Sequence, residues 1–482
     1  MQQYENANVK RRRTLIASYI AMTLAVVAIS TICILLVLGY RFDFASNQVE
    51  RGALLQFSSY PSGATITLNS EKLSFTTPGK QDVRAAAHTV SFSKTGYRAW
   101  SKQLTTRAGE VRWLNYARLV PTTVQTDTVK EFASLADEQI SPDRNWLLVL
   151  PDAEKPIFTL VDLRDPKAVK YSELTIPIDA ITNVEGSAHR FKIVEWNLGS
   201  KYVLIQHSYG EGQREYIRLD RSDTTDVVNL STKLGVTLSD IHFSSATVFY
   251  GVENGNLRRF DLGNGSLSEP LATSVTSMRL YGEKTIALVS HKDSQYTVGA
   301  FIDDRLHTVA TYDDTVGVLA EVTRYFSDYY IAIARGASFE LVKNPNKTAG
   351  HGLEKVVTLT YPGDIKWLDI SSSGRHVIAG QGTQFLTYDL ELEERTDTNL
   401  PNLNAETVNI GQPPQWLDGF VLVSTADNKL RMVDFDGDNQ QIVTDALAGF
   451  QVSLSNDNKL LYSFSKMQSG TIRLQASKMT ID

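Results

Sequence analysis

The chain has 482 residues, room for two or three domains, and a single cysteine, Cys33. One cysteine excludes an intrachain disulfide, a four-cysteine zinc site and a disulfide-stapled mini-domain, so the folded parts must rest on apolar cores. The net charge of −6 conceals an uneven distribution, because residues 51–121 carry ten Lys or Arg and three Asp or Glu, whereas residues 122–482 carry 33 and 48. The two segments are expected to have different partners, and the acidic one to repel nucleic acid.

The first predicted element is an uncharged stretch of 26 residues from Thr14 to Gly39. About 20 apolar residues suffice to cross a membrane as a helix, so we predict a transmembrane helix in contact with the lipid bilayer. Four basic residues stand directly before it: Lys10, Arg11, Arg12 and Arg13. Because such clusters stay on the cytoplasmic side, residues 1–13 are expected to be a cytoplasmic tail. After a polar linker at residues 40–50, the bulk of the protein is expected to be extracytoplasmic.

Three other interpretations of this stretch are weaker. A cleaved signal peptide has an apolar core of roughly 7–15 residues and a small-residue cleavage site, but this run is longer and is followed by Tyr40 and Arg41. A lipidated cysteine needs a small residue before it, and Ile32 precedes Cys33. A buried core helix is disfavoured by the four adjacent basic residues. A retained single-pass anchor is therefore the prediction.

Residues 51–121 alternate apolar and polar side chains in short runs such as LLQFSSYP, ATITLN and HTVSFSK, with turn-forming residues between them. A period of two predicts half-buried strands. A segment of about 70 residues is just large enough to bury a core of its own. The prediction is a small antiparallel β-sandwich.

Several turn residues of this segment resemble the PEGA domain, a small β-sandwich of envelope proteins. The resemblance rests on Pro61, Gly63 and Ala64, on Thr77 and Pro78, and on Gly96 and Tyr97. Pro and Gly suit tight turns, and Ala64 would open a strand at residues 65–68. Ser62 stands where the family has Glu, and Ala86-Ala87 where a Pro-Gly turn is common. The resemblance implies a spacer that binds proteins or surfaces and no catalyst.

The remaining segment, residues 122–482, repeats a unit of apolar runs separated by polar turns. The turns are marked by Asp143, Gly199, Ser245, Gly282, Asp328, Gly374, Gly419 and Asp457. Units of roughly 40–45 residues with four strands each are typical of β-propeller blades. We predict an all-β, eight-bladed propeller, with seven blades if two units merge. The turn at Ser141-Pro142-Asp143, followed by Trp146, is weakly similar to Tol-type, WD40-like propeller repeats.

Closure of the ring is also predicted. Only Lys478 to Asp482 follow the third run of the last unit, which is too short for a fourth strand, while residues 122–130 are β-rich and have no unit of their own. This early stretch is expected to complete the last blade, so that no sheet edge stays open.

The predicted propeller lacks the usual local motifs of catalysis and cofactor binding. Its seven histidines are scattered without H-x-H or HExxH spacing, and no GxxxxGK[ST] or GxSxG pattern occurs. The aspartates from Asp434 to Asp438 lack the Gly and Glu positions of a calcium loop and are expected in a hairpin turn. We therefore predict no catalytic residue, no metal and no cofactor.

Two segments are candidates for binding. The basic segment begins within about 10 residues of the predicted span, which places it near anionic lipid or an anionic wall polymer; the alternative is that its charges face the acidic propeller or are only solvated. A polar insertion is a candidate binding loop for a protein or glycan at the propeller rim, with a loop that has no partner as the alternative. Its residues of interest are Lys343, Asn346, Lys347, His351 and Glu354.

These features predict a membrane-anchored, extracytoplasmic scaffold of the cell envelope whose propeller is an interaction platform for protein binding. The alternative is an envelope enzyme (a lyase, hydrolase or quinone-type dehydrogenase) with its site at the central mouth, since propeller active sites are assembled from distant loops. An enzyme should show converging carboxylates, histidine or a metal at the centre. A platform should show an apolar or aromatic patch on one rim.

Overall fold

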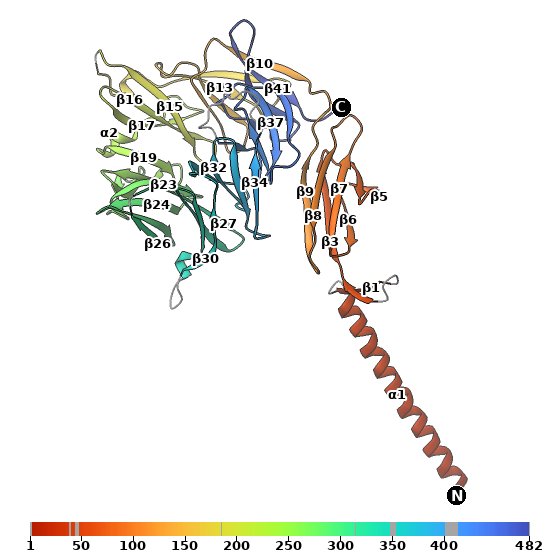
Figure 1. Ribbon diagram of the computed structural model, residues 1–482. Helices are drawn as coiled ribbons and strands as arrows, with labels where there is room; N and C mark the ends of the chain where they lie inside the picture. The colour runs from red at the N-terminus through yellow and green to blue at the C-terminus, as the bar shows by residue number, and fades with distance from the viewer. Residues whose placement is uncertain are drawn as a thin grey trace. The chain divides into compact units, whose positions relative to one another are not determined.

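The computed structural model describes residues 2–37, 40–43, 48–184, 186–313, 315–347, 353–400 and 413–481 (Figure 1). The chain divides into two compact units, Met1–Thr122 and Thr123–Asp482. The first unit holds one long helix and the strands of a small sandwich, and the second is built mainly of strands.

The first unit begins with helix α1 (Gln2–Val37). Its segment Leu15–Ile34 has 20 residues and a mean hydropathy of 2.2, and no part of it is buried. This helix is therefore long and apolar enough to cross a membrane. Lys10 to Arg13 lie in the same helix, which begins before them because no Gly or Pro interrupts residues 2–14.

The segment expected to be a linker, residues 40–50, contains two short strands. β1 (Tyr40–Asp43) pairs with β2 (Gln48–Arg51) in an antiparallel hairpin that places Tyr40 opposite Arg51. The Arg51 guanidinium lies 5.9 Å from the centroid of the Tyr40 ring, a favourable cation–π contact. Backbone pairing and this contact give the segment regular structure that its polar composition did not suggest.

The sandwich follows in two sheets. Its strands are β3 (Ala53–Tyr60), β4 (Thr65–Leu68), β5 (Glu71–Thr76), β6 (Gly79–Val83), β7 (Ala87–Ser93), β8 (Trp100–Thr105) and β9 (Val111–Arg118). One sheet has the order β6-β3-β9 and the other β5-β4-β7-β8, and only β3 and β9 pair in parallel. Alternate residues of β3 are buried, as the sequence predicted. They pack against the other sheet, where the Phe92 and Trp100 rings stack with centroids 4.9 Å apart.

The turn residues that resemble the PEGA domain meet at one end of the sandwich. Gly63 has a φ of +79°, a conformation that favours glycine. Its N–H donates to the carbonyl of Thr77 over 2.7 Å, and the Thr77 N–H donates to Ala64 O over 2.9 Å. The Ala64 N–H donates to the Thr77 side chain, also over 2.9 Å. The turns around Pro61 and Pro78 are thus joined by three hydrogen bonds.

Gly96 and Tyr97 lie at the same end and fasten the last residues of the domain. Gly96 has a φ of +83°, and Tyr97 bridges Pro121. The backbone N–H and the hydroxyl of Thr122 both donate to Gly96 O, over 2.8 and 2.9 Å. The chain therefore leaves the sandwich from a fixed position.

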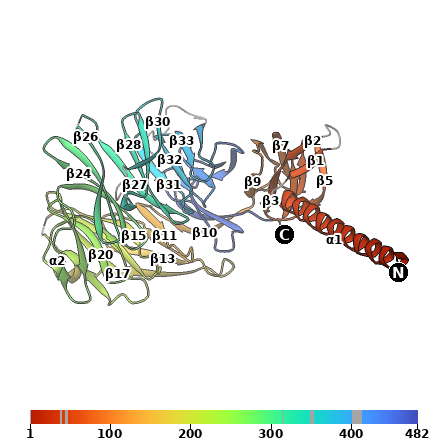
Figure 2. The same cartoon turned by 90° about the horizontal axis from the view of Figure 1, so that it is seen from below.

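The second unit contains, among its described residues, eight four-stranded antiparallel sheets, which we number as blades 1 to 8 (Figure 1, Figure 2). Blade 1 comprises β11 (Asp137–Ile140), β12 (Trp146–Leu150), β13 (Ile157–Asp162) and β14 (Lys170–Thr175), and blade 2 comprises β15 (His189–Trp196), β16 (Tyr202–Tyr209), β17 (Gln213–Asp220) and β18 (Val227–Asn229). Blade 3 comprises β19 (Leu238–Phe243), β20 (Val248–Glu253), β21 (Asn256–Asp261) and β22 (Ser266–Leu267), and blade 4 comprises β23 (Val275–Tyr281), β24 (Thr285–Lys292), β25 (Gln295–Ile302) and β26 (Arg305–Asp313). Blade 5 comprises β27 (Val318–Tyr325), β28 (Asp328–Arg335), β29 (Ser338–Lys343) and β30 (Glu354–Thr360), and blade 6 comprises β31 (Trp367–Ile370), β32 (His376–Gln381), β33 (Gln384–Asp389) and β34 (Glu394–Asn399). Blade 7 comprises β35 (Gln415–Trp416), β36 (Val421–Ser424), β37 (Lys429–Asp434) and β38 (Gln441–Asp445), and blade 8 comprises β39 (Ser453–Leu454), β40 (Leu460–Lys466), β41 (Ile472–Lys478) and β10 (Thr126–Phe132). Short helices in the connections are η1 (Ile178–Ala180), α2 (Leu230–Leu234) and η2 (Pro345–Lys347).

Closure of the ring follows the prediction from the sequence. β10, the first strand of this unit in the chain, pairs with β41 and completes blade 8. The hydroxyls of Thr126 and Ser477 lie 3.0 Å apart, and the Lys478 N–H donates to Gln125 O over 2.8 Å. The prediction of eight blades is confirmed, and the closing strand begins and ends slightly later than the stretch proposed for it.

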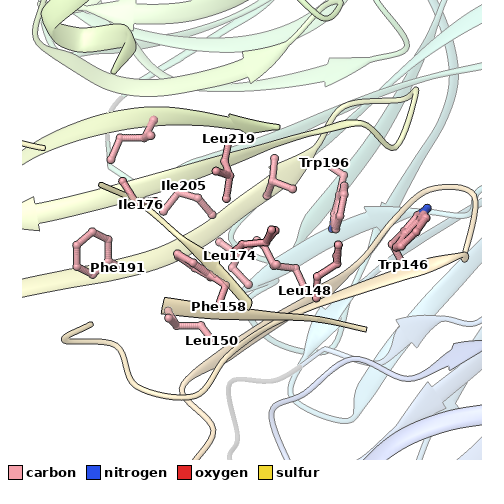
Figure 3. Close-up of a cluster of buried hydrophobic side chains, with 14 residues drawn as sticks. Trp146, Leu148, Leu150, Phe158, Leu174, Ile176, Phe191, Trp196, Ile205 and Leu219 are labelled. Carbon is pink, nitrogen blue, oxygen red and sulfur yellow. The ribbon is translucent and has the colours of Figure 1, made fainter. Parts of the chain in front are cut away.

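Apolar side chains fill the spaces between neighbouring blades. Figure 3 shows the cluster between blades 1 and 2, where Leu148 and Phe158 meet Trp196 and Ile205. All five residues of β12 are buried, since a blade packs on both faces. This is why the middle strands read as unbroken apolar runs in the sequence and do not alternate.

Candidate functional site

The centre of the propeller is surrounded by the first strands of the blades, and their polar side chains bond across blade boundaries. Asp137 of β11 accepts the Ile193 N–H of β15 over 2.8 Å. Gln415 of β35 accepts the Val452 N–H, just before β39, over 3.1 Å. A first strand has a sheet partner on one side only, so its other edge needs acceptors of this kind. These central polar groups therefore have a structural use.

His242 lies between two carboxylates at the centre. Its Nδ1 lies 2.8 Å from Glu195 of the preceding blade, and its Nε2 lies 3.5 Å from Asp240. Burial opposes a charge on the ring, but the two carboxylates outweigh it and raise the pKa of His242 to about 10. At neutral pH this histidine is an imidazolium that joins two blades. It has no free nitrogen lone pair for a general base or a metal ligand.

Three further ionisable groups stand on three successive blades: Arg279 on β23, Glu321 on β27 and Asp369 on β31. Arg279 Nε donates to Glu321 over 2.9 Å. Burial raises the pKa of Glu321 to about 7 and that of Asp369 to about 6. Within the described ranges, no three His, Cys, Asp or Glu side chains converge well enough to hold a metal ion. Carboxyl groups and a histidine are thus present at the centre. His242 is paired with Glu195 and Arg279 with Glu321.

Blade 2 carries a hydrogen-bonded row of polar side chains across its strands. His189 Nδ1 lies 2.9 Å from His207 Nε2, and His207 Nδ1 lies 2.8 Å from Glu215. His207 and Glu215 are 0 and 2 % exposed. The row was missed in the sequence, where the histidines look scattered. It could have been found from the hairpin register, because His207 and Glu215 stand opposite each other in β16 and β17.

Glu215 uses both of its oxygens within this row. Besides His207, it accepts the N–H and the hydroxyl of Thr182 over 2.8 and 2.7 Å and the Asn229 amide over 2.8 Å. Burial opposes ionisation, but these four bonds lower the pKa of Glu215 to about 2. Because every bonding position is taken, the carboxylate holds the loop before β15 to the blade and is closed to a ligand.

The candidate binding loop lies between β29 and β30 of blade 5. Lys343 and Lys347 contact Asp328 over 3.0 and 3.3 Å, and Asn346 donates to Asp303 of blade 4 over 3.1 Å. Hydrogen bonds from Asn344 and Lys343 lower the pKa of Asp328 to about 2. The polar residues of this segment therefore fasten it to the ring. Glu354 begins β30 opposite Lys343, and His351 lies outside the described residues.

A neighbouring turn of the same blade exposes an aromatic ring. Phe326, between β27 and β28, is 81 % exposed and has a φ of +51°, and its ring lies 4.5 Å from that of Tyr325. Turns between first and second strands share a face of the ring with turns between third and fourth strands. In blade 4, Tyr281 is the last residue of β23 and Leu306 is the second residue of β26, so both stand next to turns of this face, and they are 37 and 45 % exposed. We call Tyr281, Leu306 and Phe326 the rim patch.

Comparison with known proteins identifies one part of the chain. Residues 53–122 match the PEGA domain family, so the sandwich is a PEGA domain. Among solved structures, the chain is similar to an oligogalacturonate lyase from Vibrio parahaemolyticus, with 13% sequence identity over 59% of this chain and 88% of that chain and a TM-score of 0.34. At these values the likeness carries no argument about activity. No curated protein matches the chain.

Proposed function

We propose that this protein is a membrane-anchored scaffold of the cell envelope, with its PEGA domain and propeller on the extracytoplasmic side. The support is an exposed apolar helix long enough to cross a bilayer, a basic cluster before it and a PEGA domain after it. The basic cluster favours a cytoplasmic N-terminus. In this arrangement the PEGA domain spaces the propeller from the membrane.

The propeller acts in this proposal as a platform that binds a protein or glycan through the rim patch. The observation that carries the proposal is Phe326, which is 81 % exposed and has a φ of +51°. An exposed aromatic ring gains little from folding, and a left-handed backbone costs a bulky residue about 1–2 kcal/mol. An exposed ring that costs stability and makes little contact within its own chain is expected where a partner covers it.

In this proposal the charged side chains at the centre join the blades. His242 is held as a cation between Glu195 and Asp240, and Glu321 is paired with Arg279. The raised pKa values of Glu321 and Asp369 at the same place favour the second candidate, an envelope enzyme with its site at the central mouth.

The orientation is tested with cysteines in the full chain after replacement of the only native thiol, Cys33→Ser. A membrane-impermeant maleimide should label Ser327→Cys in intact cells. Gln2→Cys should be labelled only after lysis. The opposite pattern would place the propeller in the cytoplasm and overturn the proposal.

The rim patch is tested with a photo-crosslinking amino acid at position 326 of the full chain in cells. A matched control places it at Glu211, an exposed residue in a turn on the opposite face. Discrete crosslinked products are expected from position 326 and not from 211. Equal products from both positions, or products from 211 alone, would contradict a platform at this rim.

A further inference from the structure

The outer face of one sheet of the PEGA domain carries polar and aromatic side chains. Along β3 the residues that point away from the core are half-buried, namely Leu54, Gln56, Ser58 and Tyr60. The pairing register places Gln56 opposite Lys80 of β6 on one side and opposite Trp113 of β9 on the other. Because neighbouring strands lie about 4.8 Å apart, this row of three side chains spans about 10 Å.

Trp113 stands at one end of this row. It is 44 % exposed, and within the part of the chain that the structure describes its ring forms no hydrogen bond or ring contact. Val111, two residues earlier in β9, is also 44 % exposed. A ring at this exposure gains little from folding, so the indole is available to stack on a ligand.

A shallow depression lies beside the Trp113 ring. Its lining includes Gln56, Ser58, Pro78, Lys80 and Asn115. Among the described residues, the two amide side chains and the hydroxyl of this lining form no hydrogen bond, and Lys80 forms no ion pair. Asn69 of the other sheet shows the contrast, because both ends of its amide are bonded to β7. Amides and hydroxyls that are left unbonded on a surface can donate to a ligand and accept from it.

These groups match the chemistry of an acidic sugar. The C–H groups on one face of a sugar ring pack against an aromatic ring. The hydroxyls around the edge of the sugar both donate and accept, as do Gln56, Ser58 and Asn115. Lys80 can bind a carboxylate through a charge-assisted hydrogen bond. The lining therefore has a binding group for each part of a carboxylated sugar.

A protein partner fits this depression less well. Protein interfaces have an apolar centre and a polar rim. Here the central strand β3 places Gln56 and Ser58 in the middle of the depression, and Trp113 stands at its edge. The polar groups are thus where a protein interface would place apolar ones.

The face continues in one direction along β3. Two residues beyond Ser58, a distance of about 7 Å, Tyr60 stands opposite Arg118, whose guanidinium lies 5.1 Å from the centroid of the Tyr60 ring. This pair repeats the combination of an aromatic ring and a cation. In the other direction Asp82 stands opposite Leu54, and its carboxylate would repel an acidic sugar. The face is therefore bounded at Asp82 and suits a linear polymer that runs toward Tyr60.

We propose that the outer face of the β6-β3-β9 sheet binds a carboxylated polysaccharide. Trp113 stacks on a sugar ring, Gln56 and Asn115 bond to its hydroxyls, and Lys80 pairs with a carboxylate. These side chains stand on paired strands, so little conformational entropy is lost when the ligand binds. The site lies on a different unit from the rim patch and shares with the proposed function only the extracytoplasmic location.

The first test measures binding of alginate and hyaluronan fragments to the full chain in phosphatidylcholine nanodiscs. Trp113→Ala should weaken binding at least about tenfold, and Trp113→Phe, which keeps a ring, by less than about threefold. Tyr171→Ala is the matched control, because Tyr171 is also 44 % exposed but lies in the propeller, and it should leave binding unchanged. No binding of either glycan, or equal affinities of Trp113→Ala and Tyr171→Ala, would overturn the proposal.

A second pair of variants tests the charge. Lys80→Gln should weaken alginate binding about three- to tenfold at low salt and less at high salt. Lys72→Gln, at an exposed lysine in β5 of the other sheet, should have no effect. Polyglutamate, which has carboxylates but no sugar rings, should bind at least about tenfold more weakly than alginate. Equal losses in the two lysine variants, or equal binding of polyglutamate, would show a nonspecific attraction and contradict the site.

Oxidative footprinting by mass spectrometry shows whether anything else covers the face. Without glycan, Trp113 should be oxidised equally at all protein concentrations and in nanodiscs with or without phosphatidylglycerol. Alginate should protect Trp113 and leave Tyr171 reactive. Protection that grows with protein concentration would identify a second copy, protection by phosphatidylglycerol the membrane, and an unreactive Trp113 another part of the chain. Each of these three results would rule out the glycan site.

These tests are independent of the proposed orientation and of the rim patch. Cell labelling of position 327 reports on which side of the membrane the propeller lies, and it does not depend on Trp113 or Lys80. A wrong orientation and a wrong glycan site therefore give different results.

Discussion

The sandwich and the propeller solve the burial of β-strands in two different ways. In the PEGA domain each sheet has one buried face, and β3 alternates between buried and half-buried residues along its length. In the propeller every sheet packs on both faces, and β12 is buried throughout. A ring of sheets also collects unpaired first-strand edges at its centre, whereas the sandwich surrounds one apolar core. The comparison teaches that polar groups inside a propeller serve first to satisfy the backbone.

The largest effect is expected from Trp100→Ala in the sandwich. Trp100 is fully buried and stacks on Phe92, so its removal should cost about 3–5 kcal/mol of unfolding free energy. Hydrogen exchange of the full chain should speed up in β7 and β8 and stay unchanged in the propeller. Trp113→Ala is the control, because Trp113 is 44 % exposed, and it should cost less than about 1 kcal/mol. Faster exchange in both units would show that they do not unfold independently.

A smaller loss is expected from Glu215→Gln in blade 2. An amide keeps the shape of the side chain but places an NH₂ group where donors already point, so about 2–3 kcal/mol should be lost. Exchange should increase in β16, β17 and the loop held by Thr182. Glu211→Gln, at an exposed glutamate of the same hairpin, should have no effect. If the hydrogen-bonded row of blade 2 had no structural importance, the two variants would show the same hydrogen exchange.

The seam between blades 1 and 8 should make propeller stability depend on pH. Burial raises the pKa of Glu138 from 4.5 to about 8, so the folded protein holds a proton that the unfolded chain releases above about pH 4.5. Stability is therefore greatest below that value and falls as the pH rises through 8. Glu138→Gln should remove about 1–3 kcal/mol of this fall, measured by thermal unfolding between pH 5 and 9. Glu173→Gln is the exposed control, and identical pH profiles would contradict the assignment.

The smallest effect, and of opposite sign, is expected at the rim patch. Phe326→Gly relieves a positive φ and should stabilise the propeller by about 0.5–1 kcal/mol. Asn254→Gly is the matched control, because Asn254 has a φ of +50° that asparagine tolerates, and it should change stability little. Thermal unfolding measures both. Destabilisation by Phe326→Gly would show that the ring supports the fold and weaken its proposed role in binding.

Local sequence patterns were sufficient to predict the elements whose structure depends on residues close together in the chain. The apolar span, the turn of Gly63, the eight repeats and the strand that closes the ring were all predicted, since each follows from periodicity or from turn geometry. The hairpin at residues 40–50 was not predicted, because two four-residue strands carry too weak a pattern.

Only the tertiary structure decided which polar residues meet. His242 and Glu195 are joined by the packing of two blades, which no local motif encodes, whereas His207 and Glu215 meet through the register of one hairpin. The proposed binding loop shows the converse, since its lysines look available in the sequence and contact Asp328 in the fold. Secondary structure reflects short-range periodicity, whereas a site depends on contacts between residues on different strands and blades, and these exist only once the strands have paired and the blades have packed.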